Sequence, residues 1–206
     1  MADSNSFTSH FVELRSRLLN SLIFIFIAFI ISYIFAEQIY NFLVEPYANA
    51  VKNDNIPRRL IFTALHETFI TYIKVSFFAA IFFGSPVLLV QIYKFIAPGL
   101  YKNEKKTLLP YLISTPILFL FGGFLVYYLI MPLAIKFFLS FETLGSSTSL
   151  PIQLEAKVNE YLSLIMRLIF AFGISFQLPV FLTFMAKIGV VNYEYLRKRR
   201  KYVVVI

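Results

Sequence analysis

The chain has 206 residues, of which 59% are hydrophobic and 15% charged, and its formal net charge is +8. Soluble globular proteins hold about 45–50% apolar and about 25% charged residues, so this composition departs from theirs in both respects. It excludes a soluble enzyme domain, a disordered tail and a disulfide scaffold, and it predicts an all-α polytopic membrane protein.

The apolar residues gather in four stretches of 19 or more residues that contain no Asp, Glu, Lys or Arg. These stretches are Leu18–Ala36, Val75–Tyr93, Thr107–Ile135 and Leu168–Ala186. A helix of about 20 apolar residues crosses about 30 Å of hydrocarbon, so each stretch is long enough to span. We expect one transmembrane domain over residues 1–206, with spans at about 18–36, 75–93, 108–132 and 165–186.

The first apolar stretch is preceded by a short amphipathic lead-in, HFVELRSRLL, at residues 10–19. Within it Glu13 and Arg17 lie four residues apart, at the spacing of a helical ion pair. The stretch that follows is longer than the apolar region of a signal peptide, and no small-x-small cleavage pattern comes before Glu37. We therefore expect a retained first helix.

Proline and glycine divide the rest of the chain. Glu45-Pro46 predicts a turn or a helix end, Asn53–Pro57 predicts a break, and Ala97-Pro98-Gly99 predicts a tight turn between the second and third spans.

Prolines also interrupt the last two spans. The third stretch contains Pro110, Pro116 and Pro132, so kinks, tilt or an early exit are expected there. A flexible loop at Gly145–Pro151 comes next, and Glu155–Arg167 is expected to form a helix that leads into the fourth span, itself interrupted by Gly173 and Pro179. The chain ends at Tyr202–Ile206, which resembles the start of a fifth apolar segment, so we interpret it as truncated.

The charged residues sort by side of the membrane. The N-terminal tail, the 94–106 loop and the 187–206 segment together hold twelve of the 19 basic residues and four of the 11 acidic ones. The connections at 37–74 and 136–167 hold the remaining seven of each sign. Because basic residues in short loops favour the cytoplasmic side, the N-terminus is predicted to be cytoplasmic. This topology accounts for the basic residues without a nucleic-acid partner.

Few residues could perform chemistry. The chain has no cysteine and only two histidines, so neither a zinc nor a haem site has enough ligands, and we expect no metal or cofactor. Neither a G-x-S-x-G nor an H-E-x-x-H motif is present, so no enzyme is expected.

Three polar residues stand out, each with an ordinary structural alternative. Glu104 can be a counter-charge among loop lysines, Glu13 can pair with Arg17, and Gln177 can form an interhelical hydrogen bond at mid-span. Two carboxylates on one face of a membrane could instead bind two guanidinium groups of a peptide.

Several segments resemble the TatC family, the multispanning receptor subunit of the twin-arginine protein translocase. They are HFVELRSRLL (10–19), PVLLVQIYKFIAPGLYKNEKK (86–106), the YLS…M…FAFGISFQLPV run (161–180) and LRKRRKYV (196–203). The resemblance implies six helices in a concave, glove-like arrangement, of which this chain holds four and lacks the last two. Such a chain could be a fragment, a split gene product or the product of a decaying gene.

The resemblance also implies a function and its residues. A TatC-like protein binds twin-arginine signal peptides of folded precursors on the cytoplasmic face. It assembles with TatA- and TatB-like single-span subunits and with further copies of itself, and it depends on the proton-motive force. The family pattern assigns peptide binding, assembly and the concave face to distinct positions. These are Glu13, Arg15, Phe95, Pro98, Leu100 and Glu104 for the peptide, Pro46 for assembly and Gln177 for the concave face.

One of these positions departs from the family pattern. Many family members carry a glutamate where this chain has Gln177, and glutamine cannot titrate, so only a hydrogen-bonding role is expected there.

A small secondary transporter or channel is the alternative function. It would require charged pairs or broken helices around a site at the membrane midplane. The four stretches contain no charge, which favours the receptor. We expect a bacterial inner membrane or an organellar membrane as its location.

Overall fold

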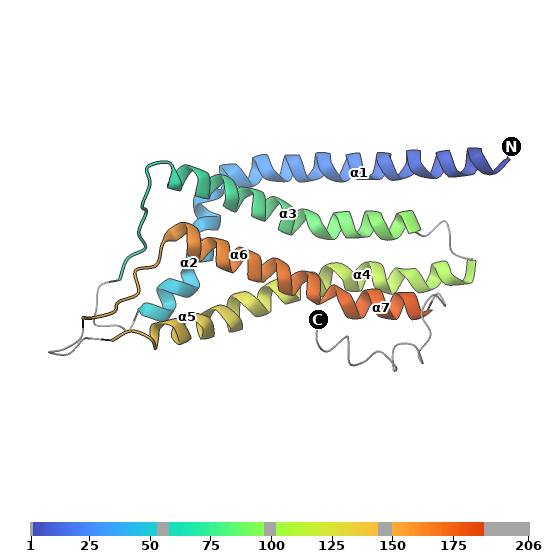
Figure 1. The fold of residues 1–206 in the computed structure, drawn as a ribbon. Coiled ribbons are helices and arrows are strands. Elements are labelled where there is room, and N and C mark those ends of the chain that lie inside the picture. The colour runs from blue at the N-terminus through green and yellow to red at the C-terminus, as the bar shows by residue number, and fades with distance from the viewer. Residues whose placement is uncertain (1, 53–57, 97–101, 144–149, 188–206) are drawn as a thin grey trace.

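A computed structural model describes the backbone of residues 2–52, 58–96, 102–143 and 150–187, and the side chains of these residues except 2–11, 93, 96 and 102–109. This part of the chain is almost entirely helical (Figure 1). In chain order the helices are α1 (Ala2–Ile34), α2 (Ala36–Val51), α3 (Glu67–Ile96), α4 (Lys102–Leu125), the π-helical turn η2 (Val126–Ile130), α5 (Met131–Leu139), α6 (Val158–Ser175) and α7 (Gln177–Lys187). The expected all-α class is confirmed.

Four segments of the described chain are long and apolar enough to cross a membrane. They are Val12–Ile34 in α1, Glu67–Ile92 in α3, Pro110–Leu139 through α4, η2 and α5, and Val158–Lys187 through α6 and α7. The last two have 30 residues each. Since that is about 45 Å of straight helix against about 30 Å of hydrocarbon, both must tilt or bend.

Both long segments depart from regular α-helix near a proline. The third contains the π-turn η2, which ends two residues before Pro132, and the fourth is divided at Phe176, three residues before Pro179. A proline lacks the N–H that the carbonyl four residues earlier would accept, so the helix widens or breaks beside it. The lead-in at residues 10–19 belongs to α1 without a break, whereas the helix expected from Glu155 begins at Val158.

The helices pack as two groups, which meet where α3 packs on α4 and α6 and where α2 packs on α3 and α5. In Figure 1, α1 lies along α3, while α4 lies beside α6 and α7, and α2 crosses at the end away from the N-terminus. Helices α4 and α6 approach very closely, because a Cβ on Gly122 would lie 2.9 Å from the Phe172 carbonyl oxygen. The main core lies around α2, η2 and α6, and its fully buried members include Val75, Val126, Met131, Val158, Leu162 and Ile165.

The expectation of a turn or helix end at Glu45-Pro46 is wrong. Pro46 is buried inside α2, which continues to Val51. Proline at this position frees the carbonyl of Phe42, and the hydroxyl of Tyr127 donates a hydrogen bond to that oxygen at 2.7 Å. The hydroxyl of Tyr161 donates to the neighbouring Leu43 carbonyl at 3.0 Å. The Tyr127 hydroxyl therefore replaces the hydrogen bond that α2 loses at Pro46, and the Tyr161 hydroxyl adds a second link to the next carbonyl.

An ion pair joins the two connections at the end of the bundle where α2 lies. Arg58 donates two hydrogen bonds, both of 2.6 Å, to the two carboxylate oxygens of Glu142. The backbone N–H of Leu154 donates to the same carboxylate. The side chains are only 6% and 17% exposed, so the pair is shielded from water. The hydrogen bonds from Arg58 lower the pKa of the Glu142 carboxyl.

Replacing Tyr127 with phenylalanine should destabilise the fold, because the Phe42 carbonyl then has no donor. We expect a loss of about 1 kcal/mol in the free energy of unfolding, measured by thermal unfolding in detergent. Tyr128→Phe is the matched control, since that ring is exposed on the same π-turn. Equal stability of the two variants would contradict the role of the Tyr127 hydroxyl.

Glu142→Gln should cost about 1–3 kcal/mol of stability, because it removes the carboxylate charge that accepts two hydrogen bonds from the buried Arg58 guanidinium. Glu155→Gln is the control. Its partner Arg59 lies 3.9 Å away and is 78% exposed, so little change is expected.

The Glu142 pair also gives the protein a defined pH dependence. Because folding lowers the pKa of Glu142, its stabilisation is complete above the unfolded pKa of about 4.3 and is lost as the pH falls through the folded value. The stability difference between the parent and Glu142→Gln should therefore shrink on acidification. A difference that stays constant down to pH 2 would contradict this assignment.

Candidate functional site

An open cavity of about 590 Å³ lies between residues 12–20 of α1 and the last turns of α3. It is lined by Val12, Glu13, Ser16, Arg17, Asn20, Gln91 and Lys94. All of these side chains except Val12 are polar or charged, and those on α1 belong to the N-terminal end of the Val12–Ile34 segment. Helix α4 begins at the same end of the bundle (Figure 1).

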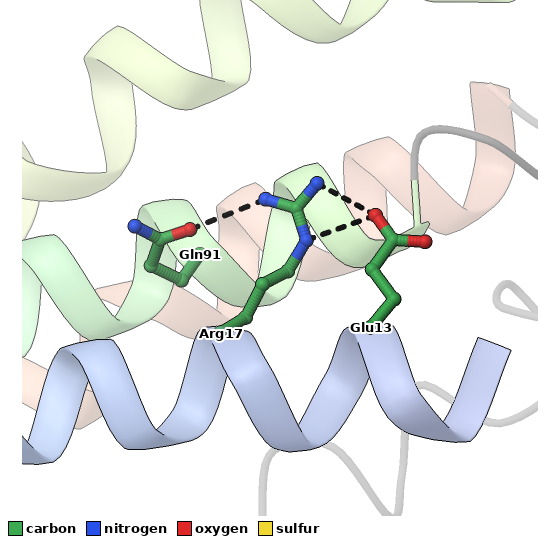
Figure 2. Close-up of polar contacts among 3 residues, drawn as sticks. All are labelled: Glu13, Arg17 and Gln91. Atoms are coloured by element: carbon green, nitrogen blue, oxygen red, sulfur yellow. Dashed lines mark hydrogen bonds and ion pairs between the residues drawn. The ribbon is translucent and has the colours of Figure 1, made fainter. Parts of the chain in front are cut away.

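Arg17 is the centre of a three-residue polar cluster in this cavity (Figure 2). Its Nε and Nη2 donate hydrogen bonds of 3.1 and 2.7 Å to Oε1 of Glu13, one helical turn away. Its Nη1 donates a hydrogen bond of 3.3 Å to Oε1 of Gln91, on α3. The guanidinium therefore holds a carboxylate of its own helix and links α1 to α3 through the Gln91 amide.

The Glu13–Arg17 pair is half-exposed, with 36% of the glutamate side chain and 29% of the arginine side chain accessible to solvent. An ion pair at this spacing and exposure contributes only about 0.2–0.5 kcal/mol. Glu13 thus does form the expected ion pair with Arg17. The pair is weak enough that the carboxylate can exchange Arg17 for another partner.

The structure describes only some of the other predicted peptide-binding residues. Arg15 is exposed on α1, and Phe95 is half-buried near the end of α3. Pro98 and Leu100 lie outside the described residues. Glu104 belongs to α4, but its side chain is not among those described. The convergence of Glu13 and Glu104 on one ligand remains a prediction.

Gln177 is the first residue of α7, directly after the division of the fourth span. Its Nε2 donates a hydrogen bond of 2.9 Å to the backbone carbonyl of Thr115 on α4. Its Oε1 and the hydroxyl of Thr115 are buried with no hydrogen-bond partner among the described residues. Gln177 also lines an apolar cavity of about 300 Å³ with Leu178 and Phe181. Its concave-face role remains a prediction.

Sequence reasoning missed Gln91. The residue is uncharged and lies inside the second apolar stretch, so a search for charge-free runs counted it as part of the span. A useful signal would have been a polar side chain three residues before Lys94, near the end of a span. Within the described part of the chain, no group of three or more His, Asp or Glu side chains could hold a metal ion.

Comparison with known proteins gives a consistent result. The family model of the Sec-independent protein translocase protein (TatC) matches residues 9–206. The TatC proteins of Magnetococcus marinus and Rickettsia prowazekii are 48% and 43% identical, over 96% and 98% of this chain and 69% and 78% of their own lengths. The crystal structure of a twin-arginine translocase receptor TatC superposes with a TM-score of 0.79 at 33% identity, over 95% of this chain and 82% of that one.

Proposed function

The chain belongs to the TatC family and is a multi-pass membrane component of a twin-arginine translocase, and we propose that it is the subunit that binds the twin-arginine signal peptide. The observation that supports this most directly is the position of Glu13. Its carboxylate lies at an open cavity and already accepts two hydrogen bonds from a guanidinium, that of Arg17. An arginine of a peptide presents the same group.

Glu13 and Glu104 together bind the arginine pair in this proposal. Each charged hydrogen bond contributes about 1.5–3 kcal/mol when shielded and less when exposed. A micromolar complex requires about 8 kcal/mol, and because the Glu13 carboxylate is half-exposed the arginines alone fall short of it. Apolar contact of the peptide with the helices supplies the remainder, and Phe95, Pro98 and Leu100 shape the loop where it enters. Arg15 lies beside this site on α1.

The orientation follows from the charge distribution. The end that holds Glu13 faces the cytoplasm of a bacterial cell, because twelve of the 19 basic residues belong to the three segments on that side. The protein catalyses no covalent chemistry. It assembles with TatA- and TatB-like single-span subunits and with copies of itself, and transport is driven by the proton-motive force.

Pro46 contributes to assembly by shaping α2. The tyrosine hydrogen bonds beside Pro46 hold α2 in place at the far end of the bundle from Glu13, where α2 packs on α3 and α5. A partner subunit would meet this rigid surface.

Neutralising either carboxylate should weaken peptide binding. Glu13→Gln and Glu104→Gln should each lower the affinity for a twin-arginine signal peptide about tenfold, measured with the full chain in lipid nanodiscs. A twin-lysine peptide should bind the parent poorly, because an ammonium cannot form the paired hydrogen bonds of a guanidinium.

Glu160→Gln is the control for these two variants. It removes the same charge from an exposed site at the opposite end of the bundle, so peptide affinity should not change. Equal binding of the two peptides by the parent, or unchanged affinity in both Glu13→Gln and Glu104→Gln, would disprove the proposal.

A further inference from the structure

The guanidinium of Arg17 occupies the acceptors that an arginine of a signal peptide would need. Three of its nitrogens donate hydrogen bonds, two to Glu13 and one to Gln91 (Figure 2). The peptide's arginine therefore cannot take this position beside α1 and α3 until Arg17 leaves it.

We propose that Arg17 is a built-in competitor that sets the selectivity of the receptor for arginine over lysine. In the free protein its guanidinium holds Glu13 and Gln91, and binding exchanges it for a guanidinium of the peptide. This inference rests on the proposed function, since it assumes that Glu13 is part of the peptide site.

The exchange favours an arginine of the peptide over a lysine. A peptide arginine can restore all three hydrogen bonds that Arg17 gives up, because both side chains carry the same planar array of donors. A lysine ammonium is a compact point charge. Its donors do not match the Glu13 and Gln91 oxygens, which lie on two helices at positions that suit a planar guanidinium. For a peptide arginine, the hydrogen bonds gained therefore nearly equal those that Arg17 gives up. For a peptide lysine, fewer hydrogen bonds are gained than are lost.

Arg17 also removes the attraction that Glu13 alone would exert on any cation. With Arg17 in place, the carboxylate is neutralised and the cavity lining keeps the positive charge of Lys94. Basic segments of unrelated proteins therefore find no net negative charge at this site. Without Arg17, the net charge of the lining falls from +1 to zero, so the repulsion of basic peptides is lost for lysine and arginine alike, with the larger effect at low salt.

The exposure of the pair is suited to exchange. A fully buried pair would hold its partners too firmly, because removing one partner leaves an uncompensated charge. With 29% of Arg17 accessible, its guanidinium can be hydrated after it leaves Glu13. The contact is thus formed in the free state and easily replaced.

Arg17→Gln tests this inference in the full chain in nanodiscs. We expect affinity for a twin-lysine peptide to rise roughly tenfold, the effect of about one charge-assisted hydrogen bond, and affinity for the twin-arginine peptide to rise only about twofold. The arginine-to-lysine selectivity should therefore fall about fivefold. Lys187→Gln is the matched control, because it removes an exposed positive charge at the same end of the bundle without touching the cavity.

Arg17→Lys separates charge from hydrogen-bond geometry. It keeps the positive charge but replaces the guanidinium, so selectivity should fall while the salt dependence of binding stays as in the parent. This variant also keeps the test decisive if Arg17→Gln does not fold.

Two results would overturn the inference. The first is that both Arg17 variants keep the arginine-to-lysine selectivity of the parent. The second is that they bind both peptides more weakly to the same extent. Either result would mean that Arg17 only holds α1 against α3. If Glu13→Gln also leaves twin-arginine binding unchanged, the proposed function itself fails. If Glu13→Gln weakens binding while the Arg17 variants keep full selectivity, only the competitor role is lost.

Discussion

The hydrocarbon core of a membrane offers no water to backbone carbonyls, and this constraint shapes the whole fold. A proline inside a helix frees a carbonyl. In α2 the Tyr127 hydroxyl donates a hydrogen bond to the carbonyl freed by Pro46, while in the spans η2 widens the helix before Pro132 and the fourth span divides before Pro179. Because Tyr127 belongs to the third span, the hydrogen bonding of α2 at Pro46 depends on how α2 packs against that span.

The charged residues act mainly at the ends of the bundle, and the two ends differ. At one end, Arg58 and Glu142 form a shielded pair that fixes two connections in place. At the other, Glu13 and Arg17 form a half-exposed pair beside an open cavity. The same chemistry therefore serves two purposes, since burial makes the first pair structural and exposure leaves the second exchangeable.

The sequence could predict what depends on local pattern. Long charge-free stretches indicated the four membrane-length helices, and the spacing of Glu13 and Arg17 indicated their pair. Patterns could not reveal contacts between distant segments. Arg58 and Glu142 are 84 residues apart. Local rules for proline predicted a turn or helix end at Pro46, because they count the backbone hydrogen bond that proline removes. They cannot include a tyrosine hydroxyl from a distant segment that replaces this bond. Gln91 was hidden because it carries no charge. The position of the Glu104 side chain stays a prediction.

The central claim is that Glu13 and Glu104 lie on the same face of the membrane and bind one peptide. The absence of cysteine from the chain permits a direct measurement with a single cysteine placed beside each acid, as Val12→Cys or Asn103→Cys. The measurement is labelling by a membrane-impermeant maleimide, applied from each side in turn. Both sites should react only from the cytoplasmic side, and a twin-arginine peptide should slow both reactions while a twin-lysine peptide does not. Labelling of the two sites from opposite faces, or protection of neither site by the twin-arginine peptide, would contradict the account.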